Sequence, residues 1–95
     1  MREFYIYILR CRDGSYYTGQ ANDVESRVNT HNLGIIKSCY TYKRRPVELV
    51  YAAAFITRKE AFAAERQIKK WSRKKKEALI LGKFDLLKKF SKKNF

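Results

Sequence analysis

Apolar and polar positions divide the first half of the chain into two predicted strands and a helix. Residues 4–11 are rich in β-branched and aromatic residues and are apolar on both faces, which predicts a strand covered on both sides. The pair Asp13-Gly14 is a turn signal, and residues 15–20 return as a second strand. Asp23 is a good N-cap and residues 32–34 a good stop, so we expect a helix between them.

The second half begins with a polar, basic loop over residues 34–46, and a third strand follows at residues 47–55. Thr57 and Glu60 form a capping box, because the two side chains can each satisfy the free amide of the other residue. The helix that starts there is predicted to run to about Trp71.

A third helix is predicted at residues 73–81, with Ser72 as its cap and Gly82 as its end. The basic tail, residues 83–95, is expected either to dock as a short helix or to fray. The element order is therefore ββαβαα with an antiparallel start. This order predicts a small α/β sandwich of the α+β kind rather than a doubly wound sheet.

Charged and imidazole side chains occupy positions where the two longer helices should bury hydrocarbon. Arg27 and His31 share the stripe of Val24 and Val28, and Glu65 lies in the middle of the apolar stripe of the later helix. A buried carboxylate without a partner costs several kcal/mol, so Glu65 needs a cation, a metal or water. Simpler interpretations stay open: a snorkelling arginine, a satisfied core histidine, and an internal Arg27–Glu65 ion pair.

The tyrosines of the predicted hairpin pose a question of register. With a two-residue turn at Asp13-Gly14, Tyr7 and Tyr17 would face opposite sides of the sheet. With a three-residue loop at residues 12–14, and Gly14 in the left-handed region, the two tyrosines share a face. We predict the second register, with Tyr5, Leu9 and Cys11 on the same face.

The charge of the chain indicates a polyanionic partner. The formal net charge is +13, and self-repulsion of that size costs stability unless a polyanion binds. Nucleic acid is the first candidate, an anionic membrane or a ribonucleoprotein interior the second, and a merely solubilising surface the alternative. The residues predicted to contact phosphate are Lys43, Arg44, Arg45, Lys69, Arg73, Lys74, Lys75 and Lys76.

Ninety-five residues fit one domain, and 45% hydrophobic residues suffice for a modest core. Cys11 and Cys39 match no metal motif and are expected to be reduced thiols of a cytoplasmic protein. The apolar run at residues 4–9 is too short for a signal peptide, and no run reaches the roughly 20 apolar residues of a membrane span.

Two tripeptides then connect the chain to a known family. "YIY" at residues 5–7 and "YTG" at residues 17–19 resemble the paired signature of the GIY-YIG nuclease superfamily. The longer segments "YILRCRDGSYYTGQANDVESRV", "RRPVELVY" and "ERQIKKWSRKKKEALI" resemble its small stand-alone, YhbQ-like group. The resemblance covers about residues 4–81, and it implies a catalytic domain over residues 1–82.

The resemblance implies a three-stranded antiparallel sheet flanked by helices and metal-dependent cleavage of phosphodiester bonds. Tyr7 and Tyr17 would contact the attacking water or the scissile phosphate, and Arg27 would steady the charge on that phosphate. His31 falls where members carry His or Tyr. Glu65 would be the single protein ligand of one Mg²⁺ or Mn²⁺ ion, and Gly19 is the glycine of the second motif.

The chain also departs from the family pattern. Tyr5 replaces the glycine of the first motif, as is common in the small group, and Gln20 stands where several members place lysine. No accessory DNA-binding domain follows. Three hypotheses remain: an endonuclease acting on DNA, a nucleic-acid-binding module with little catalysis, and a basic ribonucleoprotein component. The sequence does not indicate an oligomeric state.

Overall fold

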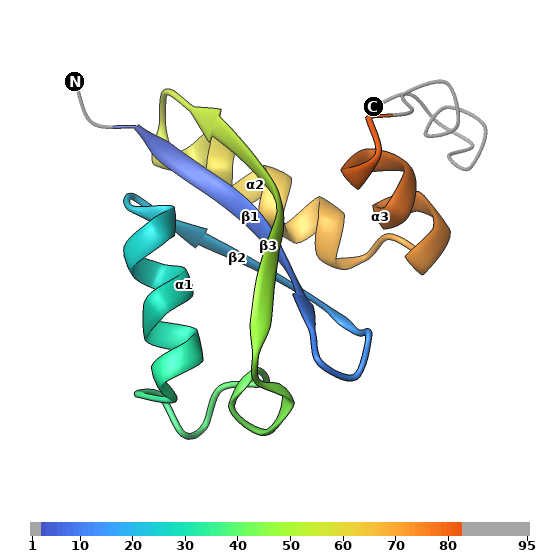
Figure 1. Ribbon diagram of the computed structural model, residues 1–95. Coiled ribbons are helices and arrows are strands. Elements are labelled where there is room, and N and C mark those ends of the chain that lie inside the picture. Colours follow the sequence, from blue (N-terminus) through green and yellow to red (C-terminus); the bar gives the residue numbers. More distant parts are fainter. Residues whose placement is uncertain (1–2, 83–95) are drawn as a thin grey trace.

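The computed structural model describes residues 3–82 as one antiparallel sheet with three α-helices (Figure 1). The predicted order ββαβαα is confirmed, and the tail at residues 83–95 lies outside the described residues. A short 3₁₀ helix, η1, interrupts the predicted loop. The elements are β1 (Phe4–Cys11), β2 (Tyr16–Ala21), α1 (Val24–Leu33), η1 (Tyr42–Arg44), β3 (Val47–Phe55), α2 (Arg58–Lys69) and α3 (Arg73–Ile80).

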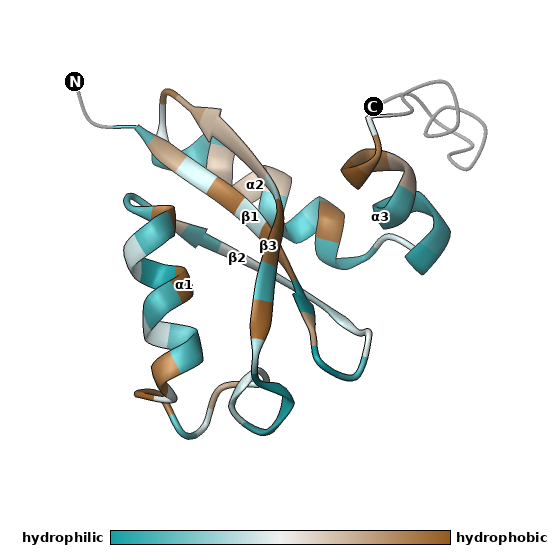
Figure 2. Ribbon diagram, in the orientation of Figure 1, coloured by the Kyte–Doolittle hydropathy of each residue, from teal (hydrophilic) through white to brown (hydrophobic). Residues whose placement is uncertain are grey.

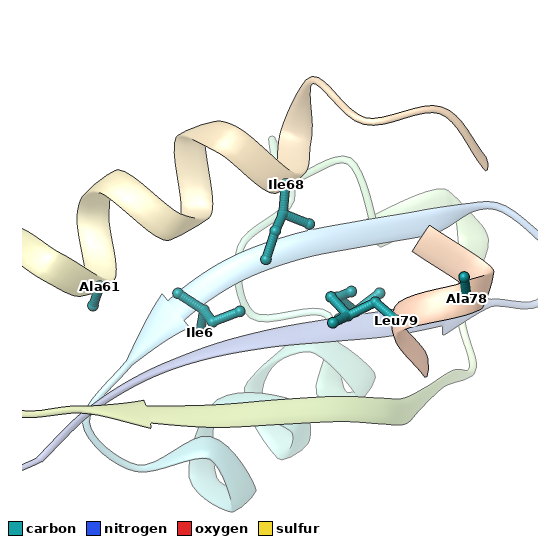
Figure 3. Close-up of a cluster of buried hydrophobic side chains, with 6 residues drawn as sticks. Ile6, Ala61, Ile68, Ala78 and Leu79 are labelled. Atoms are coloured by element: carbon teal, nitrogen blue, oxygen red, sulfur yellow. The ribbon is translucent and has the colours of Figure 1, made fainter. Parts of the chain in front are cut away.

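The most apolar strand lies at the centre of the sheet. The strand order is β2-β1-β3, and both neighbours run antiparallel to β1. Helices α2 and α3 cover one face of the sheet and α1 covers the other (Figures 1 and 3). Strand β1 is apolar on both faces because both are covered. Within residues 3–82, no helix is long and apolar enough to cross a bilayer.

The three predicted helix caps all form. The side chain of Asp23 accepts a hydrogen bond from the Ser26 amide, that of Thr57 from the Glu60 amide, and that of Ser72 from the Lys75 amide. Each oxygen satisfies an amide that the first helical turn leaves without a partner. The caps explain why sequence patterns located the helix starts to the residue.

The hairpin adopts the predicted three-residue loop. Leu9 pairs with Tyr17 and Tyr7 pairs with Gly19, so Tyr7 and Tyr17 lie on the same face of the sheet. The Cys11 amide donates to the Ser15 carbonyl, and the Gly14 amide donates to the Cys11 carbonyl. Gly14 has φ of 85°, which is the left-handed conformation that glycine adopts most readily.

A register shift between Ile8 and Leu9 changes the pairing of β1 with β3. Ile8 pairs with Tyr51 but Leu9 pairs with Leu49, so Val50 is an extra residue in β3. As a result Val50 and Tyr51, although adjacent in sequence, both pack against the core beneath α2 and α3. The sequence pattern did not predict this bulge.

The two sides of the sheet have cores of different character. Beneath α2 and α3 lie aliphatic side chains: Ile6, Ile8, Ala61, Ile68, Ala78 and Leu79 (Figure 3). The α1 side instead buries Tyr7, Leu9, Cys11, Ala21 and Val47. Helix α1 is largely hydrophilic, and its one buried residue is His31 (Figure 2). The aliphatic side chains are therefore concentrated beneath α2 and α3, and the buried Tyr7 and His31 lie on the α1 side.

Replacement of Ile8 by alanine tests this division. Ile8 is fully buried, so Ile8→Ala should lower the free energy of unfolding by about 2–5 kcal/mol. The matched variant is Ile56→Ala, at a position that is 75% exposed, and it should change that free energy by less than about 0.5 kcal/mol. Urea unfolding followed by circular dichroism measures both. Similar losses for the two variants would contradict the assignment.

Candidate active site

The two tyrosines form the floor of a site on the α1 side of the sheet. Their ring centroids lie 6.4 Å apart, and Tyr7 is fully buried. Gly19, opposite Tyr7 on β2, lies directly under the Tyr7 ring, and a Cβ atom there would overlap the Tyr7 hydroxyl and Cζ. Gly19 is thus required by the space that Tyr7 occupies, because the overlap is with a fully buried ring.

His31 reaches the phenol from α1. Its Nε2 lies 3.0 Å from the Tyr7 hydroxyl, and its Nδ1 lies 2.8 Å from Oγ1 of Thr41. The Tyr17 ring packs edge-on against the imidazole, with centroids 5.1 Å apart. The polar position in the α1 stripe is therefore a buried histidine with a partner on each ring nitrogen.

Hydrogen-bond partners assign the proton positions in this cluster. Thr41 has one hydroxyl proton, and its Oγ1 donates to the Cys39 sulfur at 3.4 Å. The same oxygen must then accept from the Nδ1–H of His31, which leaves Nε2 without a proton. Nε2 therefore accepts from the Tyr7 hydroxyl. Donation runs in one direction, from Tyr7 through His31 and Thr41 to Cys39.

Burial keeps these groups neutral near pH 7. Burial, together with the neighbouring Tyr17, raises the pKa of Tyr7 well above its usual value, although the charge of Arg27 opposes the shift. Burial also raises the pKa of Tyr17 to about 12, with Cys39 and Glu65 adding to the effect. For His31, burial and then the charge of Arg27 lower the pKa. The site at neutral pH holds two phenols and a neutral imidazole.

Arg27 and Glu65 approach the tyrosines from different helices. Arg27 is exposed on α1, and its charge acts on Tyr7, Tyr17 and His31. Glu65 belongs to α2, on the opposite side of the sheet, and its charge acts on Tyr17 of the edge strand β2. Tyr7, Tyr17 and His31 are thus in direct contact, Arg27 is hydrogen-bonded to Tyr7, and Glu65 acts on the cluster through its charge.

Glu65 is neither sealed in the core nor fully exposed. Its side chain is 15% exposed and forms an ion pair with Lys69, one turn later on α2, at 3.1 Å. The carboxylate that sequence analysis assigned to Arg27 or to a metal thus has Lys69 as its ion-pair partner. Such i,i+4 pairs contribute about 0.3–0.5 kcal/mol, so a stronger cation can replace the lysine.

The donor set suits a hard cation that keeps most of its water. Within residues 3–82, no three histidine, cysteine or acidic side chains gather into a cage for a metal. Mg²⁺ commonly binds through one or two carboxylates and takes its other ligands from water and phosphate. Glu65, a single partly exposed carboxylate, fits the small protein contribution that such an ion needs.

Some of the predicted basic residues bind other groups of the protein, and others are exposed to solvent. The Arg44 guanidinium stacks on Tyr40 at 3.8 Å, donates to the Tyr40 carbonyl and pairs with Asp13 at 3.1 Å. The Arg45 side chain donates to the carbonyls of Tyr42 and Asn32. Both arginines hold the loop that carries Thr41, a role that charge alone did not indicate.

One lysine of helix α3 is buried and is not part of the exposed basic surface. Lys75 is only 8% exposed, and its ammonium lies over the Trp71 ring at 4.2 Å. We therefore remove Lys75 from the set of predicted phosphate contacts. Arg73 pairs with Glu77 at 3.3 Å and lies over Tyr16, while Lys43 and Lys74 are exposed.

Sequence analysis missed the residues that complete the hydrogen-bonded cluster. Thr41 is 1% exposed, and Cys39 is a free thiol beside it. Burial alone would raise the pKa of Cys39, but hydrogen bonds with Thr41 and Tyr17 lower it. Both residues lie in the loop before β3, where no helical or strand period marks a position as buried.

Comparison with known proteins gives one consistent result. The family model described as the GIY-YIG catalytic domain matches residues 3–78. A UPF0213 protein of Staphylococcus saprophyticus is 51% identical over 80 residues, which are 84% of this chain and 96% of that protein. The UPF0213 protein YazA of Bacillus subtilis is 49% identical over 76 residues, 80% of this chain and 76% of that one.

Two solved structures share the fold. The solution NMR structure of a UPF0213 protein from Bacillus halodurans matches with a TM-score of 0.54 and 44% identity, covering 82% of each chain. The solution NMR structure of a protein from E. faecalis matches with a TM-score of 0.61 and 41% identity, covering 90% of each chain.

Acid should destabilise the fold through His31, the only histidine of the chain. The lowered pKa means that the unfolded chain takes up a proton near pH 6.5 before the folded protein does. The free energy of unfolding should therefore fall as pH drops from 7.5 to 5.5, by at most about 1.4 kcal/mol per pH unit. Urea titrations should find this slope abolished in His31→Gln; an unchanged slope would contradict the assignment.

Thr41→Val should disturb the tautomer of His31. The variant removes the nearer acceptor for the Nδ1–H and leaves it only the weaker Cys39 sulfur at 3.8 Å, at a cost of about 1–3 kcal/mol in stability. ¹⁵N-NMR of the single imidazole should find the Nδ1–H tautomer in the native protein and in the control Thr41→Ser, and a mixture in Thr41→Val. An unaltered tautomer in Thr41→Val would refute the positioning role.

Proposed function

The chain belongs to the GIY-YIG nuclease family, and from that membership we propose that it is a metal-dependent endonuclease that hydrolyses phosphodiester bonds in DNA. The observation that carries the proposal is the convergence of Tyr7, Tyr17 and His31, held by direct contacts, with the charges of Arg27 and Glu65 acting on them. A protein that only binds nucleic acid does not need a carboxylate beside the phosphate site, because the two negative charges repel each other.

Tyr7 and His31 supply a route for the proton of the attacking water. With a pKa so far above neutral, Tyr7 is a poor base by itself. Tyr7 is fully buried and its hydroxyl is also hydrogen-bonded to Arg27, so water would reach that hydroxyl only when Arg27 turns to the phosphate. The hydroxyl already donates to the unprotonated Nε2 of His31, so it could then pass that proton on as it accepts one from water. Burial and the charge of Arg27 disfavour a lasting imidazolium, so Nε2 of His31 would return its proton through the Tyr7 hydroxyl to solvent, and the leaving sugar oxygen would take up a proton from solvent.

Arg27 and Tyr17 act on the phosphate itself. As water attacks phosphorus and the bond to the leaving sugar oxygen breaks, negative charge builds on the nonbridging oxygens. The exposed guanidinium of Arg27, which is hydrogen-bonded to Tyr7 in the free protein, would turn to pair with them, and the protonated Tyr17 hydroxyl can donate to one of them. Neither group changes its protonation state during the reaction.

Glu65 would hold a single Mg²⁺ or Mn²⁺ ion. The bound ion would polarise a phosphoryl oxygen and stabilise the leaving oxygen. The charge of Glu65 raises the pKa of Tyr17, which supports a carboxylate near enough to share an ion with a phosphate bound at Arg27 and Tyr17. Lys69 neutralises Glu65 in the free protein and would give up this ion pair on loading.

The net charge of +13 supports a nucleic-acid substrate. The exposed cations Lys43, Lys69, Arg73 and Lys74 are proposed to contact phosphates without reading bases. A second candidate is a binding module with little catalysis. Gln20 favours it, because a cation at that position would have made Tyr17 more acidic.

Removal of the carboxylate separates the two candidates. Glu65→Gln should reduce Mg²⁺- or Mn²⁺-dependent nicking of supercoiled plasmid by at least about 10²-fold while DNA binding persists. The matched control is Glu48→Gln, which removes an exposed carboxylate paired with Arg10 on β1. Arg27→Ala should behave like Glu65→Gln. Nicking that survives in both Glu65→Gln and Arg27→Ala, or that is insensitive to EDTA, would contradict the endonuclease.

A further inference from the structure

An open hollow lies beside the catalytic cluster, and apart from Arg27 its lining has no role in the chemistry above. Its volume is about 720 Å³, within the range of ligand-binding clefts. Its lining comes from three segments that are distant in sequence: the start of β1, the end of β2 with the start of α1, and the first half of α2. The hollow therefore crosses the free edge of the sheet at β2.

The lining combines aromatic rings with positive charge. Phe4 and Phe62 contribute the rings, and Arg27, Arg58 and Lys59 contribute the cations. No carboxylate is present among the described residues that line the hollow. An anionic ligand is therefore favoured there over a cationic or a purely apolar one.

Exposure of Phe62 alone would not indicate a ligand. Its side chain is 52% exposed, but Leu33 and Ile56 are more exposed, and scattered apolar residues are normal on protein surfaces. Phe62 differs because it lines a cationic hollow and has the guanidinium of Arg66 at 5.7 Å from its ring. Arg58 lies over the Phe4 ring at 5.6 Å. Rings flanked by guanidinium groups form stacking platforms for bases.

The position of the hollow relates it to the reacting phosphate. Arg27 belongs to both the lining and the catalytic cluster. Phe62 precedes Glu65 by three residues on α2, so the two side chains lie on one side of that helix. A nucleotide in the hollow would thus be joined through the backbone to a phosphate between Arg27 and Glu65.

We propose that this hollow binds one unpaired nucleotide next to the scissile phosphate, with its base stacked on Phe62 and its phosphate paired with Lys59 or Arg58. A base in a duplex is stacked between its neighbours and cannot enter, so DNA with a single-stranded or frayed segment is the preferred substrate. The proposal rests on the proposed function, because it assumes that the phosphate at Arg27 belongs to DNA.

The test is a binding measurement in EDTA, so that cleavage plays no part. The probes are a fluorescein-labelled oligothymidylate of about 12 nucleotides and the duplex of the same length, at one fixed salt concentration. Phe62→Ala should weaken binding of the single strand by about tenfold and change binding of the duplex by less than about twofold. Phe62→Trp should restore the single-strand affinity.

Two lysines provide the matched charge control. Lys59 lines the hollow, whereas Lys74 is exposed on α3 outside its lining. Lys59→Ala should weaken single-strand binding more than duplex binding, and Lys74→Ala should weaken both equally. Circular dichroism verifies that each variant is folded.

Equal losses for the two DNA forms in Phe62→Ala, or no loss for the single strand in a folded variant, would overturn the proposal. This outcome is distinct from failure of the endonuclease, which is judged by nicking in Glu65→Gln. A protein that never nicks can still lose single-strand affinity in Phe62→Ala, and an active nuclease can prove indifferent to that change.

Discussion

The hydrogen bond between the Tyr7 hydroxyl and Nε2 of His31 joins the sheet to α1. It forms only because Gly19 leaves room for the Tyr7 ring and because Thr41 fixes the other ring nitrogen. Helix α1 has little apolar surface, and this polar contact adds to the packing of Val24 and Val28 against the apolar cluster of the sheet. The groups that carry the proposed chemistry therefore also complete the α1 side of the core.

The two faces of the sheet differ in what they bury: aliphatic side chains on one face, and phenols and an imidazole on the other. The aliphatic side beneath α2 and α3 contains conventional packing, and it keeps α2 in place so that Glu65 can approach Tyr17 across the edge at β2. The α1 side tolerates buried phenols and an imidazole because each has a partner. The phenols and the imidazole therefore do not interrupt the aliphatic packing on the other side of the sheet.

Sequence patterns predicted the elements well because caps, turns and apolar periods are local signals. Asp23, Thr57 and Ser72 each formed the expected cap, and Gly14 set the expected hairpin register. The site residues were predicted partly from charges in apolar stripes and partly from family resemblance. Thr41, the bulge at Val50 and the burial of Lys75 were not predictable, since each depends on which distant segment packs against it.

The three-residue hairpin loop has a consequence for how this chain can vary in evolution. Connections on protein surfaces normally accept insertions and deletions at small cost. Here a change of one residue between β1 and β2 would turn every side chain of β2 to the opposite face and carry Tyr17 away from His31. The contact between Tyr17 and His31 therefore depends on the length of the loop at residues 12–14, even though none of these side chains belongs to the cluster.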